Sequence, residues 1–206
     1  MEIMPDARVI VRVPEGTSEQ HIDRMLSARR EWIEEKRQEV LIKHVESEPK
    51  KFVDGEEFFY LGSKYRLSIV TEGERTLSFD GSFRLNRTRL PDAKKLFVRW
   101  YKKEAYKNIC ERAEFYGRMH GIRYSGIGIT SARHRWGSCN SKGSLAFSLR
   151  LVMAPQKVID YTVIHELAHI EHRNHSPKFW AKVGEMFPGY KECLAWLREN
   201  GHKLVI

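Results

Sequence analysis

The residues best placed to do chemistry are His165-Glu166-Leu167-Ala168-His169, which lie in a largely apolar segment. On a helix, side chains four residues apart lie on one face about one turn apart, so His165 and His169 can bind one metal ion. Glu166 can then reach a water beside that metal rather than the metal itself. A metal, a water and a nearby base are what metal-assisted hydrolysis requires. The spacing therefore predicts a metal centre with Glu166 as its general base.

The residues around this motif favour a buried helix, because apolar side chains occur on nearly every side of it between Val158 and Ile170. Three ionisable side chains inside such a helix are costly unless something pairs with them. The alternative is a pair of ordinary core histidines without a metal. A metal would satisfy both imidazoles at once, and we favour it.

A catalytic zinc ion usually takes three protein ligands, and two downstream histidines compete for the third position. His172 shares a helix face with His165 but would lie about 10 Å further along the axis, too far to join the same ion. His175 becomes a ligand only if the helix stops before it. A carboxylate of the following segment, Glu185 or Glu192, is the less favoured rival.

The sequence supplies such a stop just before His175. Asn174 tolerates the left-handed conformation that ends helices. Ser176 is typical of an N-cap, and Pro177 of the first residue in a new helix. We therefore expect His175 to lie at a sharp turn and to fold back onto the metal, with His172 at the surface or beside the ligands.

Two segments carry a resemblance to a known family. His165–His169 followed by His175–Trp180 resembles the YgjP-like metallopeptidase domain family, relatives of the SprT-like zinc proteases. Arg135-Trp136-Gly137-Ser138-Cys139 matches that family's second signature, and Val13–Thr17 and Tyr60–Gly62 extend the similarity over most of the chain.

This resemblance implies a zincin-type core with His165, His169 and His175 on zinc and Glu166 as catalytic base. The spacing of the last two histidines also equals that of the metzincins. However, His172 stands where metzincins carry a turn glycine, and no Met-turn is apparent, so we reject that family.

Arg135–Cys139 is the second candidate for a functional segment. Its glycine permits a tight backbone turn near a ligand, and Arg135 brings a fixed charge with forked donors. The alternative is a structural bulge with a core tryptophan and an arginine in an ion pair. With the resemblance, we expect a role in lining the site; Cys139 on zinc would compete with His175. The candidate substrate-binding residues are Arg135, Trp136, Ser138 and Tyr190, and the candidate donors to a developing oxyanion are His134, Arg135 and Tyr190.

Charge is unevenly distributed along the chain. The formal net charge is +9 over 206 residues, yet residues 1–90 carry 16 Lys and Arg against 17 Asp and Glu. Residues 91–206 carry 20 against 10, so the whole excess lies in the half with the metal motif. Such a bias favours acidic or nucleic-acid partners, although a solubilising role explains it equally well.

Other features indicate a cytoplasmic protein with no membrane partner. No segment is long and apolar enough to cross a bilayer, and charged residues interrupt the first 13 positions where a signal peptide would be apolar. Three widely spaced cysteines suggest no disulfide framework.

The pattern of elements predicts an α+β fold with two domains, a β-rich lobe at 1–90 and a zincin-like catalytic domain at 91–206. In the lobe we expect a strand at Arg8–Val13, one long helix from Thr17 or Ser18 to about His44, and an antiparallel meander between Glu56 and Arg87 with a hairpin turn at Asp80-Gly81. In the second domain we expect a helix from Pro91 to about His120, strands at Ile127–Arg133 and Ser144–Val152, the metal-binding helix from Ala154-Pro155, and two further helices starting at Pro177 and Pro188.

Three functions remain open from the sequence. The leading one is a zinc-dependent hydrolase, a metallopeptidase acting on a peptide or protein, which an edge strand such as Ile127–Arg133 or Ser144–Val152 could hold. The second is a nucleotide phosphoanhydride or phosphoester hydrolase that uses the same site, which the basic half would suit. The third is a non-catalytic zinc protein that binds nucleic acid, against which Glu166 argues, because a structural site has no use for a base.

Overall fold

The computed structural model describes residues 1–4, 8–46, 48–72 and 76–206. Two compact units are distinguished by their internal contacts, Met1–Pro49 with Val205, and Lys50–Leu204 with Ile206. All candidate site residues belong to the second unit. The contact boundary thus lies at Pro49, whereas the division at residue 90 remains a prediction about independently folding parts.

The first unit contains a small antiparallel ribbon and two helices. Where one long helix was predicted, two are found, because Arg29 donates its backbone N–H to Leu26, three residues back, and the helical ladder is interrupted there. Neither Gly nor Pro marks this break in the sequence. The predicted strand Arg8–Val13 is reduced to two residues. The elements are β1 Glu2–Ile3, β2 Val9–Ile10, α1 Glu19–Ser27 and α2 Arg30–Glu46.

A four-stranded sheet opens the second unit, in the order β3-β4-β6-β5. The hairpin turn at Asp80-Gly81 is confirmed, with Gly81 at φ +97°. β3 pairs antiparallel with β4, and β5 with β6, but β4 and β6 are parallel, so the strands do not form a simple meander. The chain first returns through β5, which allows β6 to run in the direction of β4. The strands are β3 Glu57–Tyr60, β4 Ser63–Val70, β5 Ser78–Phe79 and β6 Phe83–Asn86.

Helix α3, Ala93–His120, follows a short 3-10 turn at Arg87–Asp92. It ends where predicted, at Gly121 with φ +68°, a conformation that glycine adopts without steric cost. An apolar stripe along one side of α3 is buried: Phe97, Tyr101, Ala105, Ile109, Ala113 and Tyr116.

A three-stranded sheet follows in the order β7-β9-β8. Its strands are β7 Gly126–Thr130, β8 Gly137–Cys139 and β9 Ser144–Ser148. β8 lies between the two predicted strands, in the segment where we expected a tight turn or a bulge, and β9 is shorter than predicted because a 3-10 turn occupies Leu149–Met153. β9 is paired on both edges, to β7 in parallel and to β8 antiparallel, so β8 keeps an open edge within the described sheet.

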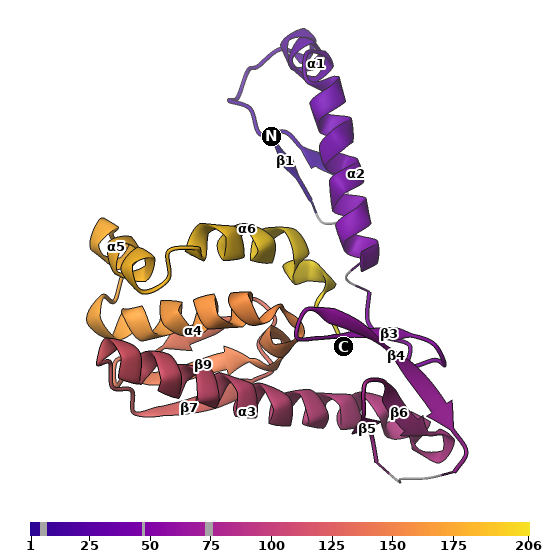
Figure 1. Ribbon diagram of the computed structural model, residues 1–206. Helices are drawn as coiled ribbons and strands as arrows, with labels where there is room; N and C mark the ends of the chain where they lie inside the picture. The colour runs from indigo at the N-terminus through magenta and orange to yellow at the C-terminus, as the bar shows by residue number, and fades with distance from the viewer. Residues whose placement is uncertain (5–7, 47, 73–75) are drawn as a thin grey trace. The chain divides into compact units, whose positions relative to one another are not determined.

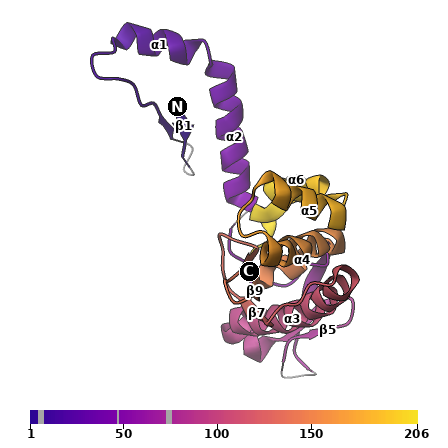
Figure 2. The ribbon, with the colours of Figure 1, turned by 90° about the vertical axis from the view of Figure 1, so that its left-hand side faces the viewer.

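Three helices complete the second unit: α4 Gln156–Glu171, α5 Pro177–Met186 and α6 Tyr190–Asn200, the last followed by a 3-10 turn at Gly201–Lys203. α4 lies between α3 on one side and α5 and α6 on the other, with β8 against it (Figures 1 and 2). Its side chains Val163, Ile164 and Leu167 are fully buried, which explains why the metal motif is set in an apolar run. Among the described residues, no helix has the length and apolar character needed to span a membrane.

Candidate metal centre

The end of α4 sets the position of the third histidine. The helix stops at Glu171, and His172 is extended at φ −127° and ψ 101° while its N–H still bonds to Ala168. Four residues after His172, Ser176 caps α5 by accepting a hydrogen bond from the Phe179 N–H. The chain therefore reverses between the two helices, and His175 points back towards α4.

The three imidazoles meet at their Nε2 atoms. His175 Nε2 lies 3.0 Å from that of His165 and 3.2 Å from that of His169. One nitrogen of each ring forms a group whose members all lie within 4.8 Å of one another. Hydrogen bonds among three such atoms cannot satisfy every lone pair, whereas one cation placed between them would. The arrangement thus fits a three-histidine metal site.

Neighbouring oxygens hold two of these rings in the required orientation. His169 Nδ1 lies 3.0 Å from the carbonyl oxygen of His172, and His165 Nδ1 lies 3.5 Å from the hydroxyl of Tyr161. A proton on Nδ1 leaves the Nε2 lone pair free for a metal, which is the usual arrangement of metal-binding histidines. Burial, then the neighbouring His169 and His175, lower the pKa of His165 to about 3, so this ring is neutral.

Aromatic side chains enclose the outer histidine. His175 stacks on Trp180 at 26° with centroids 5.7 Å apart, and Trp180 in turn stacks on Tyr190. Phe179 lies beneath His169 at 4.4 Å. The rings of Phe179 and Trp180 pack against His169 and His175 from α5 and limit the orientations of their imidazoles, although His175 remains exposed.

Glu166 is buried, with 4% of its surface exposed, and it lies directly against β8. A Cβ added to Gly137 would meet Glu166 Oε1 at 2.5 Å, so only glycine leaves room for this carboxylate. Burial raises the pKa of Glu166 to about 8, and the charge of Arg135 acts in the opposite direction. A group of this kind can exchange a proton near neutral pH.

A pocket of about 410 Å³ opens beside the motif, a size typical of ligand sites. It is formed by β8 and the residue before it, by α4 and by α6. The residues that line it are Trp136, Gly137, Tyr161, Thr162, His165, Glu166, Leu194, Leu197 and Arg198.

Trp136 is the one predicted substrate-binding residue that lines this pocket. The Arg150 guanidinium lies 4.9 Å from the centre of its indole, and a Cβ on Gly201 would approach that ring to 2.8 Å. Arg150 also donates hydrogen bonds to the carbonyls of Arg133, Gly201 and Leu204. The indole is therefore held firmly at the pocket wall.

The other predicted substrate-binding residues lie around the pocket rather than in its lining. Arg135 is exposed and acts on Glu166 through its charge, and Ser138 lies in β8 opposite Ala146. Tyr190 is part of the aromatic stack, where its ring also faces Tyr161 at 6.5 Å.

The rival metal ligands are not brought into the histidine group. Glu192 pairs with Lys157 at 2.6 Å, and Glu185 lies near Lys182. Cys139 accepts a hydrogen bond from Arg173 at 3.7 Å, and burial raises the pKa of its thiol. His172 contributes its backbone carbonyl, and His134 is exposed on the segment before β8.

Several pocket residues were missed from the sequence. Tyr161 precedes His165 by four positions, so the same helical spacing that pairs the histidines could have revealed it. Burial raises the pKa of Tyr161 to about 12, with the charge of Arg198 acting in the opposite direction. Leu194, Leu197 and Arg198 come from α6, and no local signal connects that helix with the motif.

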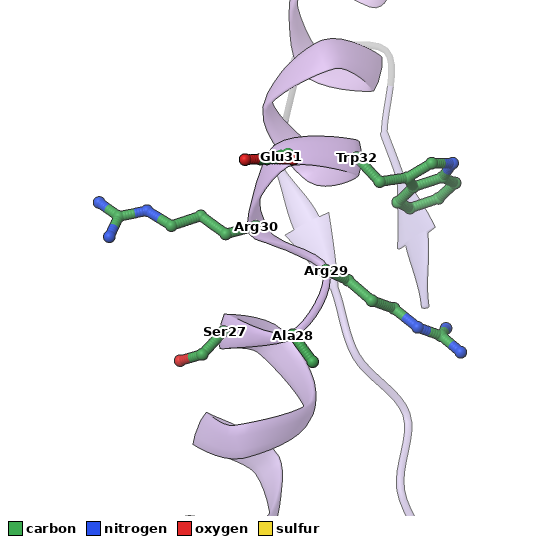
Figure 3. A pocket seen from close by; sticks show the side chains of 6 residues that line it. All are labelled: Ser27, Ala28, Arg29, Arg30, Glu31 and Trp32. Atoms are coloured by element: carbon green, nitrogen blue, oxygen red, sulfur yellow. The ribbon is translucent and has the colours of Figure 1, made fainter.

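A second concavity lies in the unit Met1–Pro49, where α1 meets α2. It is larger, about 810 Å³, and it is lined by Ser27, Ala28, Arg29, Arg30, Glu31 and Trp32. Figure 3 shows that Arg30 and Glu31 point away from Arg29 and Trp32. Because the polar groups diverge, they do not form a site that could bind and orient one ligand, and we place the chemistry at the histidines.

Three converging imidazoles, one of which lies in a pocket with a buried carboxylate, are the features of a metallopeptidase site. The model of the YgjP-like metallopeptidase domain family matches residues 1–200. The chain belongs to this family. The predicted α+β fold class is confirmed by the small sheets and the separate helices of the structure.

More distant comparisons add little. The crystal structure of the metallopeptidase zymogen of Pyrococcus abyssi abylysin is similar at 20% identity, over 48% of this chain and 99% of that one, with a TM-score of 0.43. A likeness of that size carries no argument about this protein. Comparison with curated proteins gives no significant sequence match.

Proposed function

We propose that this protein is a zinc-dependent metallopeptidase in which His165, His169 and His175 bind the metal and Glu166 is the general base. The observation that supports it is the meeting of three imidazole Nε2 atoms, one of them from His165, which lines the same pocket as the buried carboxylate of Glu166. Zinc in such a site polarises a carbonyl oxygen and lowers the pKa of water towards neutrality.

Glu166 is the residue proposed to accept and donate the proton. In its ionised form it accepts a proton from the attacking water and then delivers it to the leaving amine. Its burial suits both steps, because a carboxyl with a raised pKa retains a proton long enough to donate it. Gly137 permits this role by leaving the carboxylate its space.

Arg135 is the favoured donor to the developing oxyanion. Its charge reaches Glu166, and within the described ranges it has no hydrogen bond or ion pair that would hold it elsewhere. Tyr190 is less well placed, since its ring is part of the aromatic stack. A positioned cation stabilises negative charge that develops in the transition state.

The open edge of β8 is a suitable binding site for an extended peptide. In an antiparallel pair alternate residues bond across the ladder, and Trp136 and Asn140 bond to β9. Gly137 and Cys139 therefore direct their backbone groups to the open edge, next to Glu166. Of the two strands expected to hold substrate, β9 is paired on both sides, and β7 is the opposite edge of the sheet. We favour β8 because its Gly137 lies against Glu166. Such an edge fits a peptide better than a nucleotide.

The function is tested by metal analysis together with turnover of a peptide library and of nucleoside triphosphates. We expect about one zinc per chain, and a sharp loss of zinc in His165→Ala, His169→Ala and His175→Ala. His172→Ala is the matched control, because it keeps the backbone carbonyl that His169 uses. Glu166→Gln should keep zinc but lose at least about a hundredfold in kcat on peptides.

Two results would contradict the proposal. Turnover of nucleoside triphosphates but of no peptide would assign the site to phosphate chemistry. Peptide turnover by Glu166→Gln at the wild-type rate would remove Glu166 from the mechanism.

A further inference from the structure

Helix α6 contributes one face to the pocket beside the histidines. Leu194, Leu197 and Arg198 are spaced by three and four residues, so they lie on the same side of the helix. The two leucines form apolar wall, and Arg198 brings a positive charge to it. This side of the pocket has no role in the chemistry proposed above, which uses α4 and β8.

The side chain of Arg198 has no polar partner within the part of the chain that the structure describes. It is exposed, and it forms neither a hydrogen bond nor an ion pair there. By contrast, Arg112, Arg150 and Arg173 are all hydrogen-bonded to groups in the same unit. Its charge is nonetheless felt at the hydroxyl of Tyr161, inside the pocket. Arg198 lies in the last turn of α6, where the helix dipole favours a positive charge. The dipole does not explain why this side chain also lines a pocket.

The residues on the α6 side of the pocket indicate which chemical group of a substrate would bind there. Thr162 donates its hydroxyl to the Val158 carbonyl at 2.9 Å, so it offers no free donor. Among the lining residues Arg198 then supplies the one guanidinium, together with the apolar side chains of Leu194 and Leu197, in the pocket that also contains His165 and Glu166. One guanidinium matches one carboxylate through two parallel hydrogen bonds, and apolar walls suit the methylene groups that carry it.

We propose that Arg198 makes this side of the pocket a subsite for a substrate carboxylate close to the scissile bond. The carboxylate belongs either to an acidic side chain or to the carboxyl terminus of the peptide. Arg198 is thus a specificity-determining residue. The proposal rests on the proposed peptidase function, because it concerns the substrate of the same site.

The test compares matched peptides on the zinc-loaded full chain. An acetylated and amidated alanine-rich peptide carries one Glu, moved through each position, and is paired with its Gln counterpart. A second pair has the carboxyl terminus free or amidated. At one position, or at the free terminus, the wild type should show a kcat/KM about tenfold higher for the carboxylate, the effect of one charge-assisted hydrogen bond at an exposed site.

Arg198→Ala should bring the ratio of kcat/KM between the carboxylate peptide and its uncharged counterpart close to one. Arg198→Glu should make a peptide with Lys at the same position a better substrate than the peptide with Glu. Arg99→Ala is the matched control, since it removes an exposed arginine of α3 that does not line the pocket, and the ratio should persist. The pair that responds identifies the source of the carboxylate. A ratio that is the same in the wild type and in Arg198→Ala would overturn the proposal.

A binding measurement separates this proposal from the proposed function. The same peptides are titrated into zinc-loaded Glu166→Gln, with and without Arg198→Ala, and binding is followed by the change in intrinsic tryptophan fluorescence, to which Trp136 in the pocket contributes. We expect about tenfold weaker binding of the carboxylate peptide after Arg198→Ala. If the wild type cleaves no peptide, the peptidase function fails while this titration still decides the subsite; equal affinities would reject it.

Discussion

Gly137 is the residue on which the position of the base most directly depends. We expect Gly137→Ala to push Glu166 away, because the new methyl group would lie 2.5 Å from Oε1 and 2.6 Å from Cγ. A displacement of about 1 Å at a catalytic group costs on the order of a hundredfold in rate. Peptide turnover should fall by that factor while zinc content, measured by atomic absorption, stays near one per chain.

Gly128→Ala provides the control for this substitution. Gly128 lies in β7, and a Cβ there would meet nothing within 4 Å. Similar losses of turnover in both variants would show that strand propensity, rather than contact with Glu166, is responsible.

At the residue scale, sequence reasoning identified the three histidines, Glu166 and Trp136, but not the other residues that line the pocket. His165 and His169 follow from helical spacing, and His175 follows from the cap at Ser176, which is present in the structure. Arg198 could not be found in this way. Its role depends on α6 packing against α4, a tertiary contact that leaves no local pattern.

Among the elements, α4 requires the firmest attachment, since it carries two of the three imidazoles. Arg112 of α3 forms a bidentate pair with Asp160 of α4, at 2.6 and 3.0 Å, and Tyr116 donates to the same carboxylate at 3.1 Å. Gln156 adds a further hydrogen bond at 3.0 Å. This network fixes α4 one turn before the first histidine.

We expect Arg112→Ala to lower the free energy of unfolding by about 3 kcal/mol, because it leaves a mostly buried carboxylate without its cation. The urea midpoint of the metal-free protein measures this loss. Arg118→Ala, which breaks an exposed pair with Glu114 on the same helix, should cost less than about 1 kcal/mol. Equal midpoints for the two variants would show that the network does not stabilise the fold.

The helices of the second unit were predicted well because their ends carry local signals, such as Gly121 after α3 and Pro177 in α5. One strand and one helix break were not predicted. β8 has only three residues and is recognisable only through its pairing with β9, and the break between α1 and α2 has no Gly or Pro to announce it. The parallel pairing of β4 and β6 likewise depends on partners distant in the sequence.

On the scale of the whole molecule, all the residues proposed for catalysis lie in the unit Lys50–Leu204. We therefore expect a protein of residues 50–206 to fold and to bind zinc, because it retains both larger sheets and helices α3 to α6. Circular dichroism and metal content would test this. An unfolded or metal-free product would show that Met1–Pro49 is required, and a product of residues 91–206 would test the predicted domain boundary in the same way.

The turn between α4 and α5 performs two tasks with very few residues. His172 offers the carbonyl that orients His169, and three positions later the same turn supplies His175. The length of this turn therefore determines where His175 lies relative to the two histidines of α4. One residue inserted or removed between His172 and His175 would displace His175, whereas His172 would stay attached to α4 through its N–H bond to Ala168. Changes in that length cannot be absorbed gradually, and the metal centre would be lost in a single step.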